Sequence, residues 1–432
     1  MKRPAPVITI LALLLLLNGL SILVQLAAGA PTRQTALHDG RVLLLGRQQA
    51  DSWRVMGMAL DYMRGPHEEN VYEALLFQQG IKFQYPMSSL LFVQHLSAAA
   101  LARISQISIF VMALATWWIF RTALVRARYV VRDELLMAIG VLGVVTTFHP
   151  VMTAFTLGQI QAWINAAFAC ALLAWMAGRD RTAGAIVGVM LLIKPTFAPL
   201  LLWGLIRGRR RFWITAAGVA VTGAVAGAFV FGFDDSLAYL RALNYIGIRG
   251  EVFHHNQSWN GLLNRLLGNG DSLEFDRTGF PPPHAGVQIG TLVISVALMA
   301  LALWKPARSR VAGGALDFSI MTLTLTMASP VAWDHHYGVL LPIFAAVGPT
   351  IVATRAGGRF TIPLLVTSAF VAAQPLLFLR AFAAPPWNLV QSHLLAAACV
   401  LLWLSYRALD GAAAPVSQPG ISDSPTVVPV RG

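Results

Sequence analysis

The feature of this sequence that most constrains its fold is a series of long apolar runs separated by short arginine-rich segments. Of its 432 residues, 56% are hydrophobic and 12% are charged, about half the charge of an ordinary soluble domain. Runs of about 20 apolar residues are long enough to cross the hydrocarbon core of a bilayer. The sequence therefore predicts an all-α integral membrane protein with many spans, which excludes soluble enzyme folds.

The formal net charge of +13 gives no reason to expect a nucleic-acid partner. Lysine and arginine occur in short clusters between the apolar runs, which is the pattern of cytoplasmic loops. Both cysteines, Cys170 and Cys399, lie inside apolar runs, so neither a disulfide nor a metal site is expected from them. The sequence carries no motif typical of a nucleotide or zinc site, and we expect no cofactor and no metal.

The alternation of apolar runs and basic clusters predicts about ten spans and one re-entrant hairpin. We interpret the first span, Val7 to Leu26, as retained, although Ala28 to Ala30 resembles a signal-peptidase site. The other spans are expected at 103–124, 134–148, 159–176, 212–231, 287–304, 315–328, 337–353, 360–379 and 388–406. Residues 1–410 should form one membrane domain, and the Pro- and Ser-rich residues 411–432 a disordered cytoplasmic tail.

The hairpin is expected between Thr182 and Ile206, where the apolar run is interrupted at Lys194-Pro195. A single crossing would place four arginines outside and invert every later loop against the positive-inside rule. Two half-helices of eleven residues would each rise about 16 Å, about half of the hydrocarbon thickness. Lys194 would then lie deep in the bilayer, where an unpaired ammonium is costly. A distorted full span, from which Lys194 reaches toward the surface, is the alternative.

Two polar segments, residues 30–86 and 234–285, fall on the outer side of the membrane in this topology. Between Asp51 and Met63, the apolar positions fit a helix that lies flat on a membrane surface. The polar residues that reach the outer side are Asp51, Tyr85, His149, Gln159, residues 254–258 and Asp334 to His336. Structural roles also explain some polar positions: His149 as a helix end, Gln159 as an interhelical hydrogen bond, and Asp234 and Asp235 as a solvated cap.

This set of groups suits transfer of a chemical group from an anionic lipid. A carboxylate can take a proton from an acceptor hydroxyl as a general base. Lys194, His335 or an arginine can stabilise the charge of a departing phosphate. Because nucleotide sugars and ATP are not normally available outside the inner membrane, the donor must be carried by the membrane.

An ordered set of short motifs resembles glycosyltransferase family 87. The motifs are Asp51 with Met58-Ala59-Leu60 and Gly65, Val71-Tyr72, Phe83 to Pro86, Leu157 to Gln161, Ala183-Gly184 with Lys194-Pro195, Asn256 to Gly261, and Ser329 to His336. They extend over residues 1–407 in the same order as in the family. The resemblance implies a GT-C membrane fold with 10–12 membrane helices. It also implies transfer of a sugar, most often mannose, from a polyprenyl-phosphate-sugar donor to a lipid or glycan acceptor at the periplasmic face of the bacterial inner membrane.

The resemblance further implies that Asp51 is the general base and that His335 or His336 contacts the donor phosphate. We expect Lys194 and Gln159 at the donor phosphate or lipid as well. Substrate contacts are expected from Tyr85, His255, Asn256, Gln257, Ser258 and Trp333. Two positions depart from the family pattern: Ser52 stands where an aromatic residue often follows the aspartate, and Met87 where a second proline often follows Tyr-Pro.

Two other functions remain open at this level. A lipid or glycan flippase or transporter would also use broken helices and a buried lysine, but such proteins usually show matching breaks in two halves, and we find one hairpin. An O-antigen ligase-like enzyme with a diphosphate-linked donor would favour a large outer loop with several arginines. The candidates for this are Arg241, Arg249, Arg265 and Arg277.

Overall fold

The computed structural model describes residues 5–27, 36–131, 133–309 and 312–413, and these residues form an all-α membrane protein. The α-helices are α1 (Ala5–Ala27), α2 (Ala36–Leu44), α3 (Asp51–Arg64), α4 (Ala98–Arg126), α5 (Glu134–Thr147), α6 (His149–Thr156), α7 (Gln161–Met176), α8 (Asp180–Ile193), α9 (Pro199–Ile206), α10 (Arg210–Phe231), α11 (Phe233–Arg249), α12 (Trp259–Leu266), α13 (Ala285–Ala307), α14 (Ala315–Ala328), α15 (Leu340–Thr354), α16 (Thr361–Ala373) and α17 (His393–Ala413). The predicted fold class is confirmed. Residues 28–30 and most of the expected tail lie outside the described part of the chain.

Six described helices are long and apolar enough to cross a membrane: α1, α4, α10, α13 and the segments Asp334–Thr354 and Trp387–Gly411. A seventh span results if α5 and α6, which meet at a 59° bend, are counted as one. The expectation of about ten spans exceeds this number. Three expected spans correspond to α7, α14 and α16, which have 16, 14 and 13 residues. Such helices rise only about 20–24 Å, less than the hydrocarbon core of about 30 Å.

The contacts of its two arms confirm the hairpin shape predicted around Lys194, while its re-entry into the membrane stays a prediction. An added Cβ at Gly184 in α8 would lie 2.4 Å from the Phe212 carbonyl oxygen, and one at Gly204 in α9 would lie 2.6 Å from the Phe212 ring. Both arms therefore pass the same level of α10. The two ends of the hairpin also meet, because the Arg209 guanidinium lies 3.9 Å from the Asp180 carboxylate. Lys194 lies at the turn between the arms.

A buried ion pair fixes the base of this hairpin to α14. The Arg207 guanidinium contacts both carboxylate oxygens of Asp317, with its Nε at 2.6 Å, and the Trp203 indole donates to the same carboxylate at 3.0 Å. Around this pair the rings of Trp203, Phe212 and Phe318 pack with centroid separations between 5.3 and 6.1 Å. Breaking such a buried pair would leave an uncompensated charge, so the hairpin is held at one depth.

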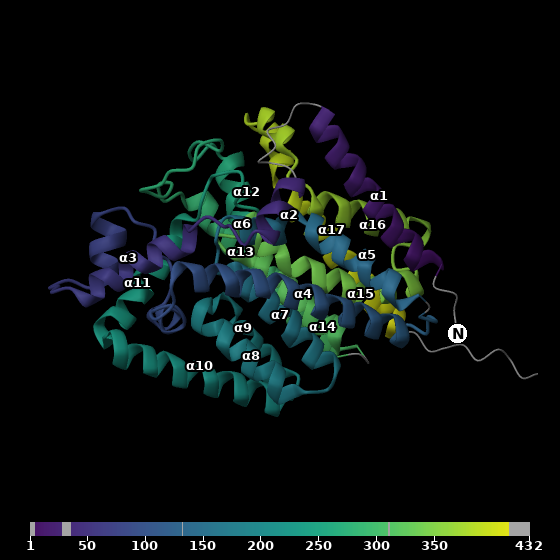
Figure 1. Cartoon of the computed structure of the whole chain (residues 1–432), viewed down its shortest axis with the longest axis horizontal. Helices are drawn as coiled ribbons and strands as arrows, with labels where there is room; N and C mark the ends of the chain where they lie inside the picture. Colours follow the sequence, from purple (N-terminus) through teal and green to yellow (C-terminus); the bar gives the residue numbers. More distant parts are fainter. Residues whose placement is uncertain (1–4, 28–35, 132, 310–311, 414–432) are drawn as a thin grey trace, which may run out of the picture.

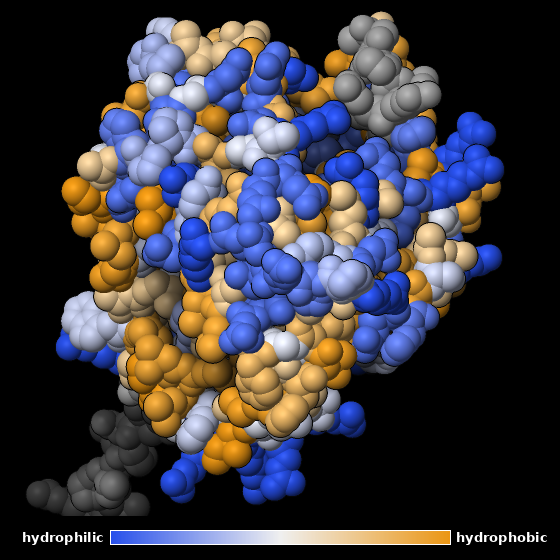
Figure 2. Space-filling model, turned by 90° about the vertical axis from the view of Figure 1, so that its left-hand side faces the viewer, coloured by the Kyte–Doolittle hydropathy of each residue, from blue (hydrophilic) through white to orange (hydrophobic). Residues whose placement is uncertain are grey.

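Helices α3 and α11 form one end of the molecule, at the left in Figure 1. Viewed from this end, Figure 2 shows hydrophilic side chains across the centre and right, with hydrophobic ones at the left and below the centre. Helix α3 follows the prediction, but its apolar residues Trp53, Met56 and Leu60 are buried in the protein. The interpretation of α3 as a membrane-surface helix was therefore wrong. Helix α11 was not expected, and the Asp235 side chain near its start is buried and accepts the Val71 N–H at 2.7 Å.

Helix α6 connects the two groups of polar residues that the next section describes. It begins at His149-Pro150, where the missing N–H of proline is tolerated in the first helical turn. Its eight residues rise about 12 Å. His149 lies at one end of α6, and the Gly158-Gln159 turn follows the other end.

Candidate functional site

The Asp51 carboxylate lies at the start of α3 and accepts a hydrogen bond from the side-chain amide of Gln159. The Ser52 hydroxyl donates to the Gln159 carbonyl oxygen at 2.7 Å and lies 2.7 Å from the Tyr85 hydroxyl. Since Ser52 uses its proton toward Gln159, the Tyr85 hydroxyl donates to Ser52. The structure thus brings Asp51, Gln159 and Tyr85 together around Ser52. The sequence had marked Ser52 only as a departure from the family pattern, and its place beside Asp51 was the available signal.

Backbone contacts fix the position of Asp51 against the turn after α6. The Asp51 N–H donates to the Leu157 carbonyl at 3.0 Å, and the Gln49 N–H donates to the Thr156 carbonyl at 2.8 Å. Gly158 adopts φ +69°, and a Cβ there would lie 1.9 Å from the Gln49 carbonyl oxygen. Only glycine fits this close approach with this backbone conformation. The Leu157-Gly158-Gln159 motif therefore places the Gln159 amide at the carboxylate.

Lys194 reaches the same region from the hairpin. Its ammonium donates to the side-chain carbonyl of Gln161 at 2.9 Å, and the Gln161 amide donates to Asn165 at 2.8 Å. The Asn165 amide in turn donates to the His335 backbone carbonyl at 3.2 Å. Lys194 is partly exposed, whereas Gln161 and Asn165 are buried. The predicted residues Lys194 and His335 are therefore joined through two amide side chains that the sequence had not identified.

The two predicted histidines lie on the short 3₁₀ helix Asp334–Val339. Their rings are 4.8 Å apart and perpendicular. The Nδ1 atom of His336 accepts the Trp333 N–H at 3.2 Å, and the ring also hydrogen-bonds the Val331 backbone. His335 is the more buried of the two and interacts electrostatically with Lys194, Asp334 and His255.

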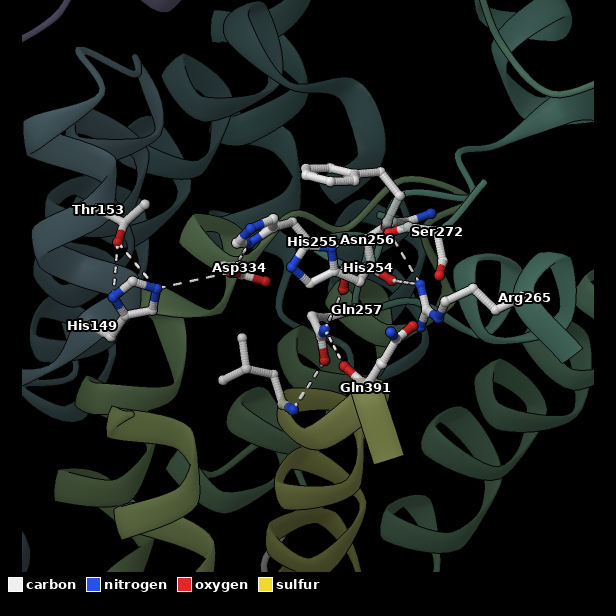
Figure 3. A network of polar contacts seen from close by, with 12 residues as sticks. His149, Thr153, His254, His255, Asn256, Gln257, Arg265, Ser272, Asp334 and Gln391 are labelled. Atoms are coloured by element: carbon white, nitrogen blue, oxygen red, sulfur yellow. Dashed lines mark hydrogen bonds and ion pairs between the residues drawn. The ribbon is translucent and has the colours of Figure 1, made fainter. Parts of the chain in front are cut away.

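A second polar group is centred on Asp334, which lies between two imidazole rings in Figure 3. One carboxylate oxygen pairs with Nδ1 of His255 and lies 3.8 Å from Nε2 of His149. The His149 Nδ1 atom is 3.1 Å from the Thr153 hydroxyl. The other carboxylate oxygen is buried and has no hydrogen-bond partner among the residues described. Asp334 lies in the Ser329 to His336 motif, but the sequence alone gave it no specific role.

The surroundings change the proton affinity of the groups in the outer segments. Desolvation raises the pKa of Asp51, although the Gln159 hydrogen bond and the Arg54 charge oppose this increase. Burial alone would lower the pKa of His255, but the Asp334 carboxylate outweighs it, so the pKa is raised. Burial, assisted by the His255 charge, lowers the pKa of the neighbouring His254 to about 3. His254 is therefore neutral near pH 7, while His255 is the more readily protonated of the two.

Three residues expected to bind substrate use their polar atoms within the protein. The Asn256 amide donates to the Glu251 carbonyl at 2.8 Å, and its oxygen accepts the Ala332 N–H at 2.9 Å. Gln257 donates to the Gln391 carbonyl at 2.7 Å and accepts the Leu394 N–H at 3.0 Å (Figure 3). Ser258 caps α12 by accepting the Gly261 N–H at 3.0 Å. These contacts favour a scaffold role, in which Asn256, Gln257 and Ser258 hold His255 and Trp333 in place.

Three of the outer-segment arginines also have internal partners. Arg265 is buried and donates to the Asn256 carbonyl at 3.0 Å and to Ser392 at 2.6 Å. Arg241 pairs with Glu73 at 2.5 Å, and Arg249 lies 3.8 Å from the centroid of the Tyr245 ring. These internal contacts give three of the four arginines that suggested an O-antigen ligase-like enzyme a structural role, and Arg277 is the fourth.

Together, the fold and these side chains define a class: multi-pass all-α membrane proteins with a carboxylate, an ammonium and imidazoles around a short helix (α6) and the start of the helix that follows it. A sequence model of glycosyltransferase family 87 matches residues 83–330, more than half of the chain. The chain therefore belongs to glycosyltransferase family 87, as its motifs predicted. No solved structure shows a significant match to it.

Among curated proteins, the chain is similar to two polyprenol-phosphate-mannose-dependent alpha-(1-2)-phosphatidylinositol pentamannoside mannosyltransferases. The relative from Mycolicibacterium smegmatis is 32% identical over 203 residues, which cover 45% of this chain and 44% of that protein. The relative from Mycobacterium tuberculosis is 28% identical over 216 residues, which cover 49% and 45% of the two chains. The chain thus matches slightly less than half the length of each relative.

Proposed function

We propose that the chain transfers a mannosyl group from a polyprenyl-phosphate-mannose donor to a hydroxyl group of a lipid or glycan acceptor. The printed names of the relatives support the donor, and membership of glycosyltransferase family 87 supports the reaction class. The observation that carries the proposal is the attachment of Asp51 and Lys194 to the same short segment at the start of α7, through Gln159 and Gln161.

In this proposal, Asp51 is the general base. Its carboxylate accepts the proton of the acceptor hydroxyl while the hydroxyl oxygen forms a bond to the anomeric carbon. The bond between that carbon and the phosphate oxygen breaks, and the polyprenyl phosphate leaves with the electron pair. Gln159 orients the carboxylate, and Ser52 and Tyr85 hold Gln159 in turn.

The departing phosphate requires positive charge and hydrogen-bond donors. Lys194 supplies an ammonium at the turn of the hairpin, next to the first residue of α7. The N-terminus of α7 adds the positive end of a helix dipole. His335, His336 and the imidazolium of His255 complete the set, with Asp334 orienting His255. Such preorganised groups act where charge develops in the transition state.

We place this site at the periplasmic face of a bacterial inner membrane. The hairpin ends at Arg207, Arg209, Arg210 and Arg211, and the positive-inside rule assigns that cluster to the cytoplasm. Lys194, at the opposite end of the hairpin, then faces outward. This orientation also suits a donor that is anchored in the membrane.

Incubation of membranes containing the protein with a panel of radiolabelled polyprenyl-phosphate sugars tests the proposal. Control membranes lack the protein, and the extracted products are separated into lipid-linked and other glycans. We expect the mannose label to move to an acceptor only when the protein is present. Absence of transfer from every donor, with correctly inserted protein and added membrane lipids, would exclude the proposed reaction.

A further inference from the structure

A buried ion pair that the proposed mechanism does not use joins the two outer segments of the chain. The Lys82 ammonium of the first outer segment lies 2.8 Å from the Glu251 carboxylate of the second. The two side chains are only 8% and 1% exposed, respectively. Removal of two charges from water is costly unless good geometry and further contacts compensate it, so a pair at this depth requires an explanation.

Further contacts compensate both charges of this pair. The Lys82 nitrogen lies 4.4 Å from the centroid of the Phe275 ring and 4.3 Å from the centroid of the Phe280 ring. At such distances the face of an aromatic ring attracts a cation. The second carboxylate oxygen of Glu251 accepts the Val252 N–H at 3.2 Å. Because their charges are used within the protein, Lys82 and Glu251 fit a positioning role better than direct contact with a substrate.

On the first outer segment, Lys82 lies close in sequence to the group that holds the proposed base. This group, here called the base group, consists of Asp51, Ser52, Gln159 and Tyr85. Lys82 is three residues before Tyr85. The Tyr72 hydroxyl donates to the Tyr85 carbonyl at 2.6 Å, and the buried Phe83 ring stacks on the Tyr72 ring at 5.4 Å. Successive contacts therefore hold residues 82–85, so the position of Lys82 affects that of Tyr85.

On the second outer segment, Glu251 is connected to the residues around Asp334. The imidazole group, as we call it, consists of His149, His255 and Asp334. The Asn256 amide donates to the Glu251 carbonyl at 2.8 Å, and its oxygen accepts the Ala332 N–H at 2.9 Å. The Asp334 N–H donates to the His255 carbonyl at 3.1 Å. Asn256 thus connects the backbone at Glu251 to the segment that carries Asp334.

We propose that Lys82 and Glu251 are a positioning pair that sets the distance between the base group and the imidazole group. This inference rests on the proposed transferase function, in which the base group activates the acceptor hydroxyl and the imidazole group helps to stabilise the departing phosphate. The two partners are 169 residues apart in sequence, so their contact fixes segments that the chain itself leaves far apart. A misplacement of about 1 Å between reacting groups can lower a rate about 100-fold.

A second ion pair between the same two segments supplies a matched control. Arg241 of α11 pairs with Glu73, but these side chains are 68% and 28% exposed. Exposed pairs contribute little to stability, because water and salt screen them. The control variant is Arg241→Met with Glu73→Gln. The test variant is Lys82→Met with Glu251→Gln, which removes both charges and nearly preserves the volumes, so that no unpaired charge stays buried.

Steady-state transfer from polyprenyl-phosphate-mannose to added membrane lipids tests the positioning role. We expect the test variant to have at least about tenfold lower kcat, with KM for the donor within about twofold of wild type and an unchanged melting temperature. The control variant should keep both kinetic constants, and Lys82→Arg, which retains the charge, should keep kcat within about threefold. A smaller loss of kcat in the test variant, an equal loss in the control, or a loss accompanied by a lower melting temperature would overturn the proposal.

Hydrogen exchange of the purified full-length protein in detergent tests the same pair without catalysis. Loss of the pair should raise exchange in the peptides that contain residues 79–86 and 250–258, because local opening of these segments becomes easier. The control variant should leave both peptides unchanged. Unchanged exchange in the test variant would overturn the proposal, whatever its kcat. Raised exchange in both peptides, in a protein whose wild type transfers no mannose, would reject the reaction but retain the connection between the segments.

Discussion

Gln159 and Gln161, two residues apart at the start of α7, hold the Asp51 carboxylate and the Lys194 ammonium, respectively. One short segment thereby sets the separation between the proposed base and the proposed phosphate-binding cation. Asp51 comes from the first outer segment and Lys194 from the hairpin, so neither group is fixed relative to the other by its own element. The predictions below follow from this relationship and its supports.

Removal of the Gln159 amide should shift the pH dependence of the reaction. Gln159 donates to the ionised Asp51 carboxylate and so opposes the desolvation that raises the pKa of Asp51. Gln159→Leu should therefore raise this pKa further and move the acidic limb of the kcat/KM profile to higher pH. Measurement of mannosyl transfer between pH 4 and pH 8 checks this prediction. An acidic limb at the same pH in both proteins would show that the limb does not report the protonation of Asp51.

Substitution of Lys194 should act on the donor. Lys194→Ala removes the ammonium at the turn of the hairpin and should raise KM for the polyprenyl-phosphate donor about 10–100-fold, the cost of about 1.4–2.7 kcal/mol of binding free energy. Lys194→Arg keeps the charge and should retain more of the affinity. A donor titration that is identical for wild type and Lys194→Ala would remove Lys194 from the phosphate site.

The tight turn after α6 predicts a strong effect at Gly158. Gly158→Ala meets both a positive φ and the Gln49 carbonyl oxygen at 1.9 Å, so the turn must move and carry Gln159 with it. We expect at least about tenfold lower kcat. Gly178→Ala is a matched control, because Gly178 has a similar φ of +71° but no atom within 4 Å of an added Cβ. Gly178→Ala should cost only the backbone strain of about 1 kcal/mol and keep its activity. Equal loss in both variants would attribute the effect to strain alone.

Loss of the Asp334 charge should alter the titration of His255. Asp334 is the group that raises the pKa of His255 against the effect of burial, so Asp334→Asn should lower that pKa. His255 would then lose its proton at lower pH, and donor binding should weaken at correspondingly lower pH. The titratable and charged groups near His255 are His254, Asp334, Arg265, Arg380, His149 and His335. The shift is measured from the pH dependence of 1/KM for the donor, on the basic side of the profile. If this basic limb is at the same pH in wild type and Asp334→Asn, His255 is excluded as a phosphate ligand.

Much of the fold could be predicted from the sequence, because charge and hydropathy are properties of each residue that do not depend on its contacts in the fold. The hairpin was predictable from Lys194-Pro195 and the arginines beside it, and the structure confirms its shape. The number of full spans was not predictable, because the short helices α7, α14 and α16 are apolar enough to resemble spans. The apolar face of α3 was assigned to the membrane surface for a similar reason: periodicity shows that a face is apolar but does not identify what covers it.

The proximity of several candidate site residues could be predicted from the sequence, while their roles in binding and catalysis stay predictions. We expected five of these residues near one another, and hydrogen bonds connect them in two sets. Asp51, Gln159 and Tyr85 are connected through Ser52. Lys194 and His335 are connected through Gln161 and Asn165. Asn256, Gln257 and Ser258 were expected to bind substrate, but hydrogen bonds to distant segments of the chain use their polar atoms. Ser52, Gln161 and Asn165 were missed because their partners lie between 33 and 170 residues away in sequence, except for the Gln161–Asn165 pair.

The most direct test of the account compares wild type with Asp51→Asn in transfer of radiolabelled mannose from polyprenyl-phosphate-mannose to added membrane lipids. Asparagine preserves the size of the side chain and removes the basic carboxylate. The account predicts at least about a 100-fold lower kcat, as expected for loss of a general base, with equal amounts of inserted protein and little change in KM for the donor. Transfer by Asp51→Asn at the wild-type rate would contradict the central claim that Asp51 activates the acceptor hydroxyl.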